Sequence, residues 1–425
     1  MNPQSHDAAA QTGEAPLPLA GIRVVEFTHM VMGPTCGMML ADLGAEVIKI
    51  EPVQGDNTRR LKGSGAGFFA MFNRNKKSLP VNLQDPRGIE LVLKLIASAD
   101  IVSENFKAGT MARLGLDYAT LSRLNERLIY VSHKGFLPGP YQHRTALDEV
   151  VQMMGGLAYM TGPEGRPLRA GAAVNDIMGG MFGAMGAMAA LLERARTGRG
   201  QEVQSALFEN NVFLVGHHMM QYAVTGKPAA PMPSRISAWA VYDVFTVKDG
   251  EQIFLAVVSD TQWKLFCEAF GFVDLALDAR LAGNNDRVEA RSWLMPMLRE
   301  RMAPLAAADI AARFEAQGLP YAPIAKPQDL FDDPHLTATG GLADITLPQD
   351  GAGSGGAGNG AAGNGAAGKH AKVPLLPITL GGRRPGVRTD PPALGAQGAQ
   401  LLETLGLSAT QIAALTEAGV VGPVN

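Results

Sequence analysis

The stretch that decides the fold is LAGIRVVEFTHMVMGPTCGMMLADLGAEVIKIE, residues 19–51. Its first part, 21–27, is short and rich in β-branched residues, which is typical of a buried strand. A Gly-Pro-Thr break follows, and Thr35 is expected to cap a helix whose apolar face ends at Gly44. The apolar run 45–50 predicts a second strand. Strand, helix and strand in this order predict a βαβ unit and a parallel α/β sheet.

The same alternation continues beyond this unit. The apolar periodicity predicts a helix over 86–98, a strand over 101–104, a helix over 111–125 and a strand over 128–132. A long apolar segment then begins at Asp176, carries arginines near its end and stops at Gly198, so we expect a single helix there. The first part of the chain therefore has the pattern of an α/β domain.

Composition changes mark the expected domains. Residues 1–18 lack a regular pattern and predict a disordered lead-in, followed by a large domain over 19–224. A Pro-rich connector opens a smaller α+β domain over 225–330, which contains a predicted hairpin pair of strands. The last segment, 331–425, is expected to return to the large domain, interrupted by a flexible Gly/Ala linker over 351–368.

Charge and cysteine content exclude several classes of protein. A formal net charge of −3 is not that of a dedicated nucleic-acid binder, and no apolar run is long enough to span a membrane. Cys36 and Cys267 have no disulfide or metal-ligand spacing, so we expect a cytoplasmic protein without a metal site. The turn over 28–34 lacks the G-x-G-x-x-G pattern, which argues against a dinucleotide cofactor.

Basic residues recur in the N-terminal third, in predicted loops where α/β proteins bind ligands. One interpretation is a solvated charged face, and the other is a site for a polyphosphate ligand. The residues concerned are Arg59, Arg60, Lys62, Arg74, Lys76, Lys77, Lys107, Arg113 and Lys134.

Asp176 is the most informative acidic residue. It stands at the predicted start of an apolar helix, where an Asp commonly caps the backbone. The alternative is that the carboxylate is a nucleophile in an apolar pocket. Small residues follow at three- and four-residue steps, from Gly179 to Ala190, and predict a face built for close contact with a neighbouring helix or a ligand. The local sequence leaves both roles of Asp176 open.

Several motifs together resemble the class III coenzyme A transferase family, which includes formyl-CoA transferase, carnitine CoA-transferase and α-methylacyl-CoA racemase. The resemblance runs from Leu19 to the C-terminus, apart from the 351–368 insertion. It rests on the ordered motifs LADLGAEVIKIE (40–51), NKKS (75–78), ENF (104–106) and TGRGQ (197–201). It implies a Rossmann-like large domain built from both chain ends, a smaller α+β domain, and an interlocked homodimer.

The resemblance also implies a chemistry. Asp176 matches the family's nucleophile, which forms an aspartyl-CoA thioester by way of mixed anhydrides, with an acyl-CoA donor and a carboxylate acceptor. CoA is then a substrate, and no tightly bound cofactor or metal is needed. The positions expected to bind CoA are Val31, Met32, Lys77, Asn105, Phe106, Arg113 and Lys134.

Departures from the family pattern limit the choice of substrate. Val31 and Phe136 replace the Gln and Tyr of formyl-CoA transferase, so an oxalate-type substrate is not expected. Leu147 replaces the His that supplies the racemase branch with a second base, which argues against racemisation. A non-catalytic CoA-binding protein is the remaining alternative. A nearby set of cations suggests a dicarboxylate partner: His143, Arg144, Arg169 and Arg235.

Overall fold

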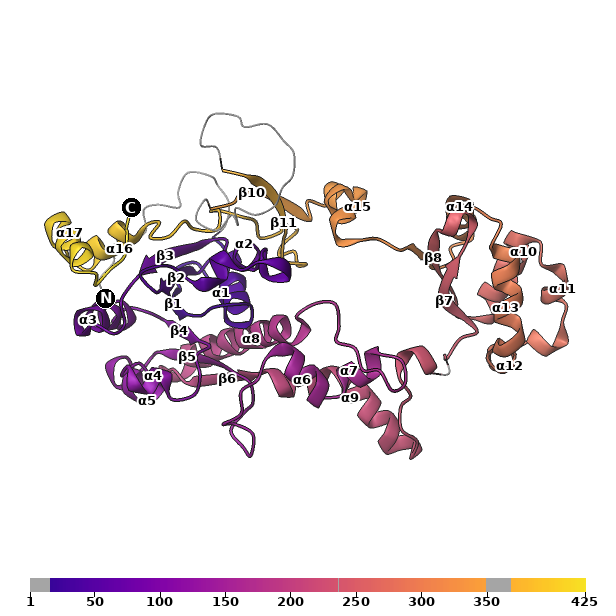
Figure 1. Cartoon of the computed structure of the whole chain (residues 1–425), viewed down its shortest axis with the longest axis horizontal. Coiled ribbons are helices and arrows are strands. Elements are labelled where there is room, and N and C mark those ends of the chain that lie inside the picture. The colour runs from indigo at the N-terminus through magenta and orange to yellow at the C-terminus, as the bar shows by residue number, and fades with distance from the viewer. Residues whose placement is uncertain (1–15, 236, 349–367) are drawn as a thin grey trace. The chain divides into compact units, whose positions relative to one another are not determined.

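A computed structural model of the chain describes residues 16–235, 237–348 and 368–425 (Figure 1). The chain divides into two compact units, one formed by residues up to 228 together with 335–425, the other by 229–334. The expected lead-in and linker fall largely on residues 1–15 and 351–367, which lie outside the described residues.

The centre of the first unit is a six-stranded sheet in the order β3-β2-β1-β4-β5-β6 (Figure 1). All neighbouring strands are parallel, which confirms the α/β expectation. From β1 the chain adds β2 and β3 on one side and then crosses back to add β4, β5 and β6 on the other. The connections that follow β1 and β4 therefore run over opposite faces of the sheet. The strands are β1 (Arg23–Phe27), β2 (Glu46–Glu51), β3 (Lys76–Pro80), β4 (Ile101–Glu104), β5 (Ile129–Lys134) and β6 (Glu202–Ala206).

Helices cover both faces of this sheet. Val24 and Val25 of β1 are fully buried in different apolar clusters, as expected for a strand enclosed on both sides. The cluster around Val24 includes residues of α1 (Met32–Asp42) and α8 (Val174–Thr197).

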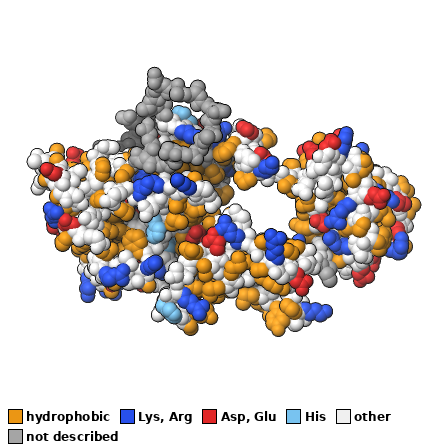
Figure 2. Space-filling model, in the orientation of Figure 1, with side chains coloured by type: hydrophobic (Ala, Val, Ile, Leu, Met, Phe, Trp, Pro, Cys, Tyr) orange, Lys and Arg blue, Asp and Glu red, His pale blue; other side chains and the backbone are white. Residues whose placement is uncertain are grey.

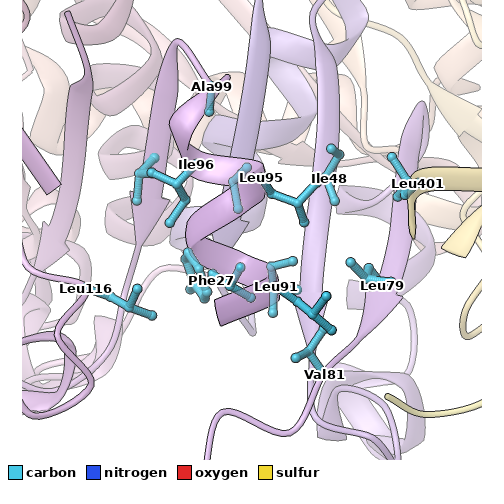
Figure 3. Packing of buried hydrophobic residues seen from close by; sticks show 14 of the residues in the cluster. Phe27, Ile48, Leu79, Val81, Leu91, Leu95, Ile96, Ala99, Leu116 and Leu401 are labelled. Atoms are coloured by element: carbon cyan, nitrogen blue, oxygen red, sulfur yellow. The ribbon is translucent and has the colours of Figure 1, made fainter. Parts of the chain in front are cut away.

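The opposite face is packed by α3 (Pro86–Ala97) and by two helices near the C-terminus, α16 (Gly398–Thr404) and α17 (Ala409–Glu417). Figure 3 shows Leu91 and Leu95 beside the strand residues, with Leu401 contributed from near the other end of the chain. The first unit therefore contains segments from both parts of the sequence.

Two predicted helix boundaries are wrong. The helix expected over 111–125 is two helices, α4 (Thr110–Arg113) and α5 (Tyr118–Leu124), because Gly115 adopts a left-handed backbone and Asp117 caps the second helix. Thr35 does not cap α1. The helix begins earlier, with Val31 at the cap position, and the Thr35 hydroxyl donates to the Val31 carbonyl.

The second unit contains a three-stranded sheet in the order β7-β8-β9. The antiparallel pairing of β7 (Val241–Thr246) with β8 (Gln252–Val257) confirms the expected hairpin pair. Helices pack against this sheet around the buried side chains of Phe266 and Phe314. The other elements of this unit are β9 (Tyr321–Pro323), α10 (Asp260–Phe270), α11 (Val273–Ala276), α12 (Asn284–Glu289), α13 (Arg291–Met302) and α14 (Ala307–Ala316).

The remaining elements belong mainly to the first unit. Among the described residues, no helix has the length and apolar character needed to cross a membrane. The same residues contain no cluster of three side chains suited to hold a metal ion. The helices and strands not yet listed are α2 (Phe68–Phe72), α6 (Asp148–Met154), α7 (Leu157–Thr161), α9 (Leu207–Thr225), α15 (Pro334–Ala338), β10 (Leu342–Thr346) and β11 (His370–Pro374).

Candidate active site

A crevice is expected between β1 and β4, because ligands of open α/β sheets bind where the strand order reverses. The loops that follow these strands are joined there. The amide oxygen of Asn105 accepts a hydrogen bond from the His29 N–H at 3.1 Å, and its nitrogen donates to the His29 carbonyl at 2.8 Å. The rings of His29 and Phe106 lie 6.0 Å apart. Asn105 and Phe106, both expected to bind CoA, therefore lie at the expected ligand edge.

Sequence reasoning did not select His29, although the residue follows the first strand closely. Its position at the carboxyl end of β1 was the available signal. Burial lowers the pKa of His29, which favours the neutral imidazole. A neutral ring beside Phe106 is suited to contact an aromatic base of a nucleotide.

Lys134 is tied to the same loop through Glu104. Its Nζ lies 2.6 and 2.9 Å from the two carboxylate oxygens of Glu104 and donates to the Phe106 carbonyl at 2.9 Å. Glu104 also accepts from the Ser132 hydroxyl and from the Phe106 N–H. Lys134 is thus beside Asn105 and Phe106, as the sequence indicated, but an internal carboxylate already partners its charge.

Arg113 lies on the exposed surface of α4 and donates to the Thr110 hydroxyl at 3.1 Å. Within the described part of the chain, Lys62, Lys107 and Arg113 form no ion pair with an acidic side chain. Lys107 and Arg113 both follow β4. These two cations therefore remain available for an anionic ligand at the edge that holds Asn105.

Most of the basic cluster found in the sequence has a structural role instead. Lys76, Arg59 and Arg74 are buried and form ion pairs with carboxylates. The Nζ of Lys77 lies 2.6 Å from Glu46, which also pairs with Arg23 near the amino ends of the strands. The structure therefore does not bring Lys77 together with Asn105, and its role in binding CoA remains a prediction.

Val31 and Met32 lie at the start of α1, after Met30, which adopts a left-handed backbone. The side chains of Val31 and Met32 are both buried. Met32 packs against α8 so closely that a Cβ added to Gly179 would lie 2.3 Å from its Cε. This contact places Met32 beside the first turns of α8.

The small-residue face of α8 fits against protein neighbours. A Cβ on Gly180 would lie 2.5 Å from the Met32 carbonyl oxygen, and one on Gly183 would lie 2.4 Å from the His133 ring. These contacts confirm the expected close approach and identify α1 and β5 as the elements that approach α8. Glycine is required here because a side chain would separate α8 from the sheet.

Asp176 is the third residue of α8 and does not cap it. The Oδ2 atom of Asp148 accepts hydrogen bonds from the N–H groups of Asn175, at 2.7 Å, and of Asp176, at 3.0 Å. A residue from α6 therefore performs the capping role that Asp176 was one candidate to fill. In the described ranges, no hydrogen-bond donor or cation contacts the carboxylate of Asp176.

The electrostatic surroundings make the Asp176 carboxylate unusually basic. Burial and, second, the negative charge of Asp148 raise its pKa to about 7. A carboxylate that titrates near neutral pH and has no internal partner is free to react with a bound electrophile. This combination favours the nucleophile interpretation of Asp176.

Asp148 and Gln152 are the site residues that sequence reasoning missed. The Nε2 of Gln152 donates to Asp148 Oδ1, and Gln152 Oε1 accepts from the Ala170 N–H at 2.8 Å. Both side chains are buried on α6. No local pattern reveals this arrangement, because the groups they bind are backbone N–H groups that the tertiary fold brings near.

The structure offers no second base in the position used by racemases. Leu147 precedes Asp148 and its side chain is 60% exposed. His133 is buried on β5, where its Nε2 lies 3.1 Å from the Ser103 hydroxyl. Burial lowers the pKa of His133 to about 3. The ring contacts Gly183, about two turns along α8 from Asp176.

The cations expected to meet a dicarboxylate are distributed unevenly. Arg169 forms an ion pair with Glu149 and precedes Ala170, which is bound by Gln152. Arg144 lies over the Tyr141 ring at 4.2 Å. Arg235 belongs to the second unit. Arg169 is therefore connected to the network around Asp148 through its neighbour in the chain.

Comparisons with known proteins agree with the family resemblance. A family model described as CoA-transferase family III matches residues 19–398. The chain is 35% identical to a succinate–glutarate CoA-transferase of Agrobacterium fabrum, over 77% of this chain and 85% of the relative. It is 31% identical to a succinyl-CoA–D-citramalate CoA-transferase of Chloroflexus aurantiacus, over 94% and 97%.

A solved structure has the same fold. A CAIB/BAIF family protein from Brucella suis superposes with a TM-score of 0.79 at 33% identity, covering 92% of this chain and all of that one. The family match covers most of the sequence, from just before β1 to the first residue of α16. These findings confirm the resemblance carried by the motifs, and the chain belongs to family III of the CoA-transferases.

Proposed function

We propose that this enzyme transfers CoA between dicarboxylic acids, with Asp176 as the nucleophile that carries CoA as an aspartyl thioester. The observation that carries the proposal is the Asp176 carboxylate, which is partly buried and beside Asp148 rather than a cation. Among the described residues of the first unit, four other buried acids each form an ion pair with a buried cation. In the described residues Asp176 has no such cation, and the proposed reaction needs a reactive carboxylate at this position.

The first half of the reaction consists of two exchanges. An oxygen of ionised Asp176 attacks the thioester carbonyl carbon, the C–S bond breaks, and CoA leaves as a thiolate. The thiolate then attacks the Asp176 carbonyl carbon of the mixed anhydride. The donor acid leaves as a carboxylate, and Asp176 remains as an aspartyl-CoA thioester. Each step begins and ends with one negative charge, so no proton is consumed.

The acceptor acid reverses these steps. Its carboxylate attacks the aspartyl thioester and expels the CoA thiolate, and the thiolate attacks the acceptor carbonyl of the new anhydride. The new acyl-CoA forms and Asp176 is released as a carboxylate. Energy of the donor thioester is retained throughout, so the exchange needs no nucleotide hydrolysis.

The CoA substrate is assigned to the crevice between the β1 and β4 loops. His29 and Phe106 supply rings beside the hydrogen bonds that join Asn105 to His29. Lys107 and Arg113 supply cations without an internal acidic partner in the described residues. A polyphosphate needs local positive charge because the protein has a net charge of −3. Lys134, Val31 and Met32 support the same loops, and Lys77 is kept as a predicted contact.

The dicarboxylate substrate is supported by two observations. The relatives from Agrobacterium fabrum and Chloroflexus aurantiacus are named for succinate, glutarate and citramalate. Arg169 adjoins the residues that hold the start of α8, and a second carboxylate needs such a cation. Its ion pair with Glu149 is half-exposed and can be exchanged for a substrate carboxylate at low cost.

The same proposal includes a homodimer whose subunits interlock. Helices α8 and α9 expose large apolar side chains, and Figure 2 shows hydrophobic atoms gathered over the region of α6, α7 and α9. An apolar surface of this kind marks an interface, and a second copy of this chain fits the family's assembly. The exposed residues are Met181, Met185, Leu192, Phe213, Met219, Met220, Tyr222 and Val224. Light scattering should give twice the 44.8 kDa chain mass, and a monomer at micromolar concentration would contradict the dimer.

An exchange assay tests the proposed reaction. Succinyl-CoA is mixed with an unlabelled panel of dicarboxylates and monocarboxylates in deuterated water, and the acyl-CoA products are identified by mass spectrometry. We expect new dicarboxyl-CoA thioesters with no deuterium at the α-carbon. Deuterium incorporation without exchange would indicate a racemase, and binding without either product would indicate a CoA-binding protein.

The controls separate chemistry from folding. D176N preserves the shape of the side chain and should abolish exchange. E164Q changes an exposed acid in the loop before α8 and should leave exchange unchanged. Equal loss in both variants would contradict the assignment of Asp176.

A further inference from the structure

The start of α8 is held by a buried chain of hydrogen bonds that runs from Ala170 to Asp148. Gln152 joins the two: it accepts from the Ala170 N–H and donates to Asp148 Oδ1. Asp148 then uses its other oxygen for the N–H groups of Asn175 and Asp176. Gln152 is fully buried and Asp148 is 5% exposed. The backbone of the proposed nucleophile is therefore held by a carboxylate rather than by water.

This arrangement changes the usual effect of a helix N-terminus. Free N–H groups at such an end favour a nearby negative charge, so an Asp in the first turn is ordinarily stabilised in its ionised form. Here Asp148 accepts from two of these groups and places its own negative charge at the helix end. Asp176 consequently has a second carboxylate bound to its own backbone N–H, where the helix end would otherwise leave unsatisfied donors.

We propose that Asp148, held by Gln152, is a positioning residue that disfavours the ionised form of Asp176 and so promotes its conversion into the uncharged acyl forms. The proposal rests on the proposed function of Asp176. When Asp176 becomes an anhydride or a thioester it loses its negative charge, and repulsion from Asp148 disappears. The free carboxylate is thus raised in free energy relative to both covalent intermediates.

The other titratable groups near α8 are not among the groups that shift the pKa of Asp176. Asp148 is the sole charged group that perturbs Asp176 among the described residues, and the direction of that effect is a raised pKa. Glu149 of α6 is paired with Arg169, Lys134 of β5 with Glu104, and Asp42 of α1 with Arg74. The remaining groups on elements packed against α8 are Cys36, Tyr130, His133, Glu202, Glu209, His217, His218 and Tyr222.

The deciding variant is D148N, which keeps an oxygen acceptor for the helix N–H groups, removes the charge and gives up the Gln152 hydrogen bond, whose loss Q152M measures separately. The acidic limb of kcat/KM for succinyl-CoA reports ionisation of the nucleophile in the free enzyme. In the wild type its midpoint should lie near 7. In D148N we expect the midpoint to fall by roughly one pH unit or more, and the steady-state fraction of acylated Asp176 to fall about tenfold.

A second variant separates charge from geometry. Q152M releases Asp148 from its hydrogen bond but leaves the charge in place, so kcat should fall without a large change in the midpoint. E164Q is the matched control, and thermal unfolding checks that each variant is folded. If D148N does not fold, D148S supplies a neutral hydroxyl acceptor in its place.

The possible results distinguish the two proposals. A wild type that forms no covalent Asp176 adduct contradicts the proposed function itself. A wild type that forms the adduct, together with a neutral variant whose midpoint and acylated fraction are unchanged, overturns the role of Asp148 alone. A lowered midpoint with a smaller acylated fraction supports it.

Discussion

Carboxylates of the first unit lie beside cations beneath α1 and beside each other at the start of α8. Beneath α1, Glu26 lies 2.8 Å from Lys76, and both side chains are fully buried. At α8, Asp176 and Asp148 share the same helix end without a cation contacting Asp176 in the described residues. The first arrangement satisfies charge and stabilises the fold, whereas the second leaves the Asp176 carboxylate without a compensating cation. The difference separates structural acids from the acid that we assign to catalysis.

The largest expected effect comes from replacing Asp176, the proposed nucleophile. D176N should lower kcat for CoA exchange by about 10⁴-fold or more, because loss of a covalent nucleophile removes the whole pathway. Stopped assays with succinyl-CoA and glutarate measure the rate, and the unfolding temperature should not fall. Residual exchange within tenfold of the wild type would remove the distinction between the two regions.

Breaking a paired carboxylate should have the opposite signature. E26Q leaves the buried ammonium of Lys76 without its carboxylate and should cost about 3 kcal/mol of unfolding free energy. Urea denaturation measures this loss, with E164Q as the exposed control. The folded fraction of E26Q should retain exchange activity. A stable E26Q protein without activity would mean that this pair also serves catalysis.

The pH dependence of stability tests the unpaired carboxylate directly. The pKa of Asp176 is raised to about 7 in the folded protein, above its value of about 4 in an unfolded chain. Between these values the folded state holds the proton more tightly, so this residue makes stability fall as the pH rises from 4 to 7.

D176N removes this contribution. Its unfolding free energy relative to the wild type should therefore increase with pH, by on the order of 4 kcal/mol between pH 4 and pH 8. Denaturation at several pH values measures the difference. A constant difference across this range would show that neither burial nor Asp148 raises the pKa of Asp176 in the folded protein.

The smallest effect is expected at the proposed CoA crevice, where a surface cation would meet a solvated phosphate. R113A should raise the KM for succinyl-CoA about tenfold with little change in kcat, since the contact is made equally in substrate and transition state. R123A, which removes an exposed arginine from α5, is the matched control. Equal KM values for R113A and R123A would exclude Arg113 from the CoA site.

Local sequence accounted for much of the sheet but not for its edges. The β-branched run of β1 and the short apolar run that begins β4 are strong local signals, and both strands were predicted. Strands β3 and β6 were not predicted, because lysine, serine and glutamine interrupt their apolar pattern. Their strand conformation depends on pairing with β2 and β5, which are distant in the sequence.

The candidate site divides in the same way. Asp176 and the Asn105–Phe106 pair were found because each lies in a motif of contiguous residues. Asp148 was not found, because its partners are backbone N–H groups 27 and 28 positions away. The basic residues show the converse error: Lys76 and Arg59 have the composition of an anion site, but internal carboxylates bind them.

The most direct test of the account is to trap the covalent intermediate. The enzyme is incubated with succinyl-CoA and hydroxylamine, digested, and mapped by mass spectrometry, with D176N treated in parallel. We predict a hydroxamate at Asp176 in the wild type and none in the variant, because hydroxylamine attacks the activated Asp176 carbonyl. CoA exchange that continues while Asp176 remains unmodified, or a hydroxamate at another carboxylate, would contradict the account.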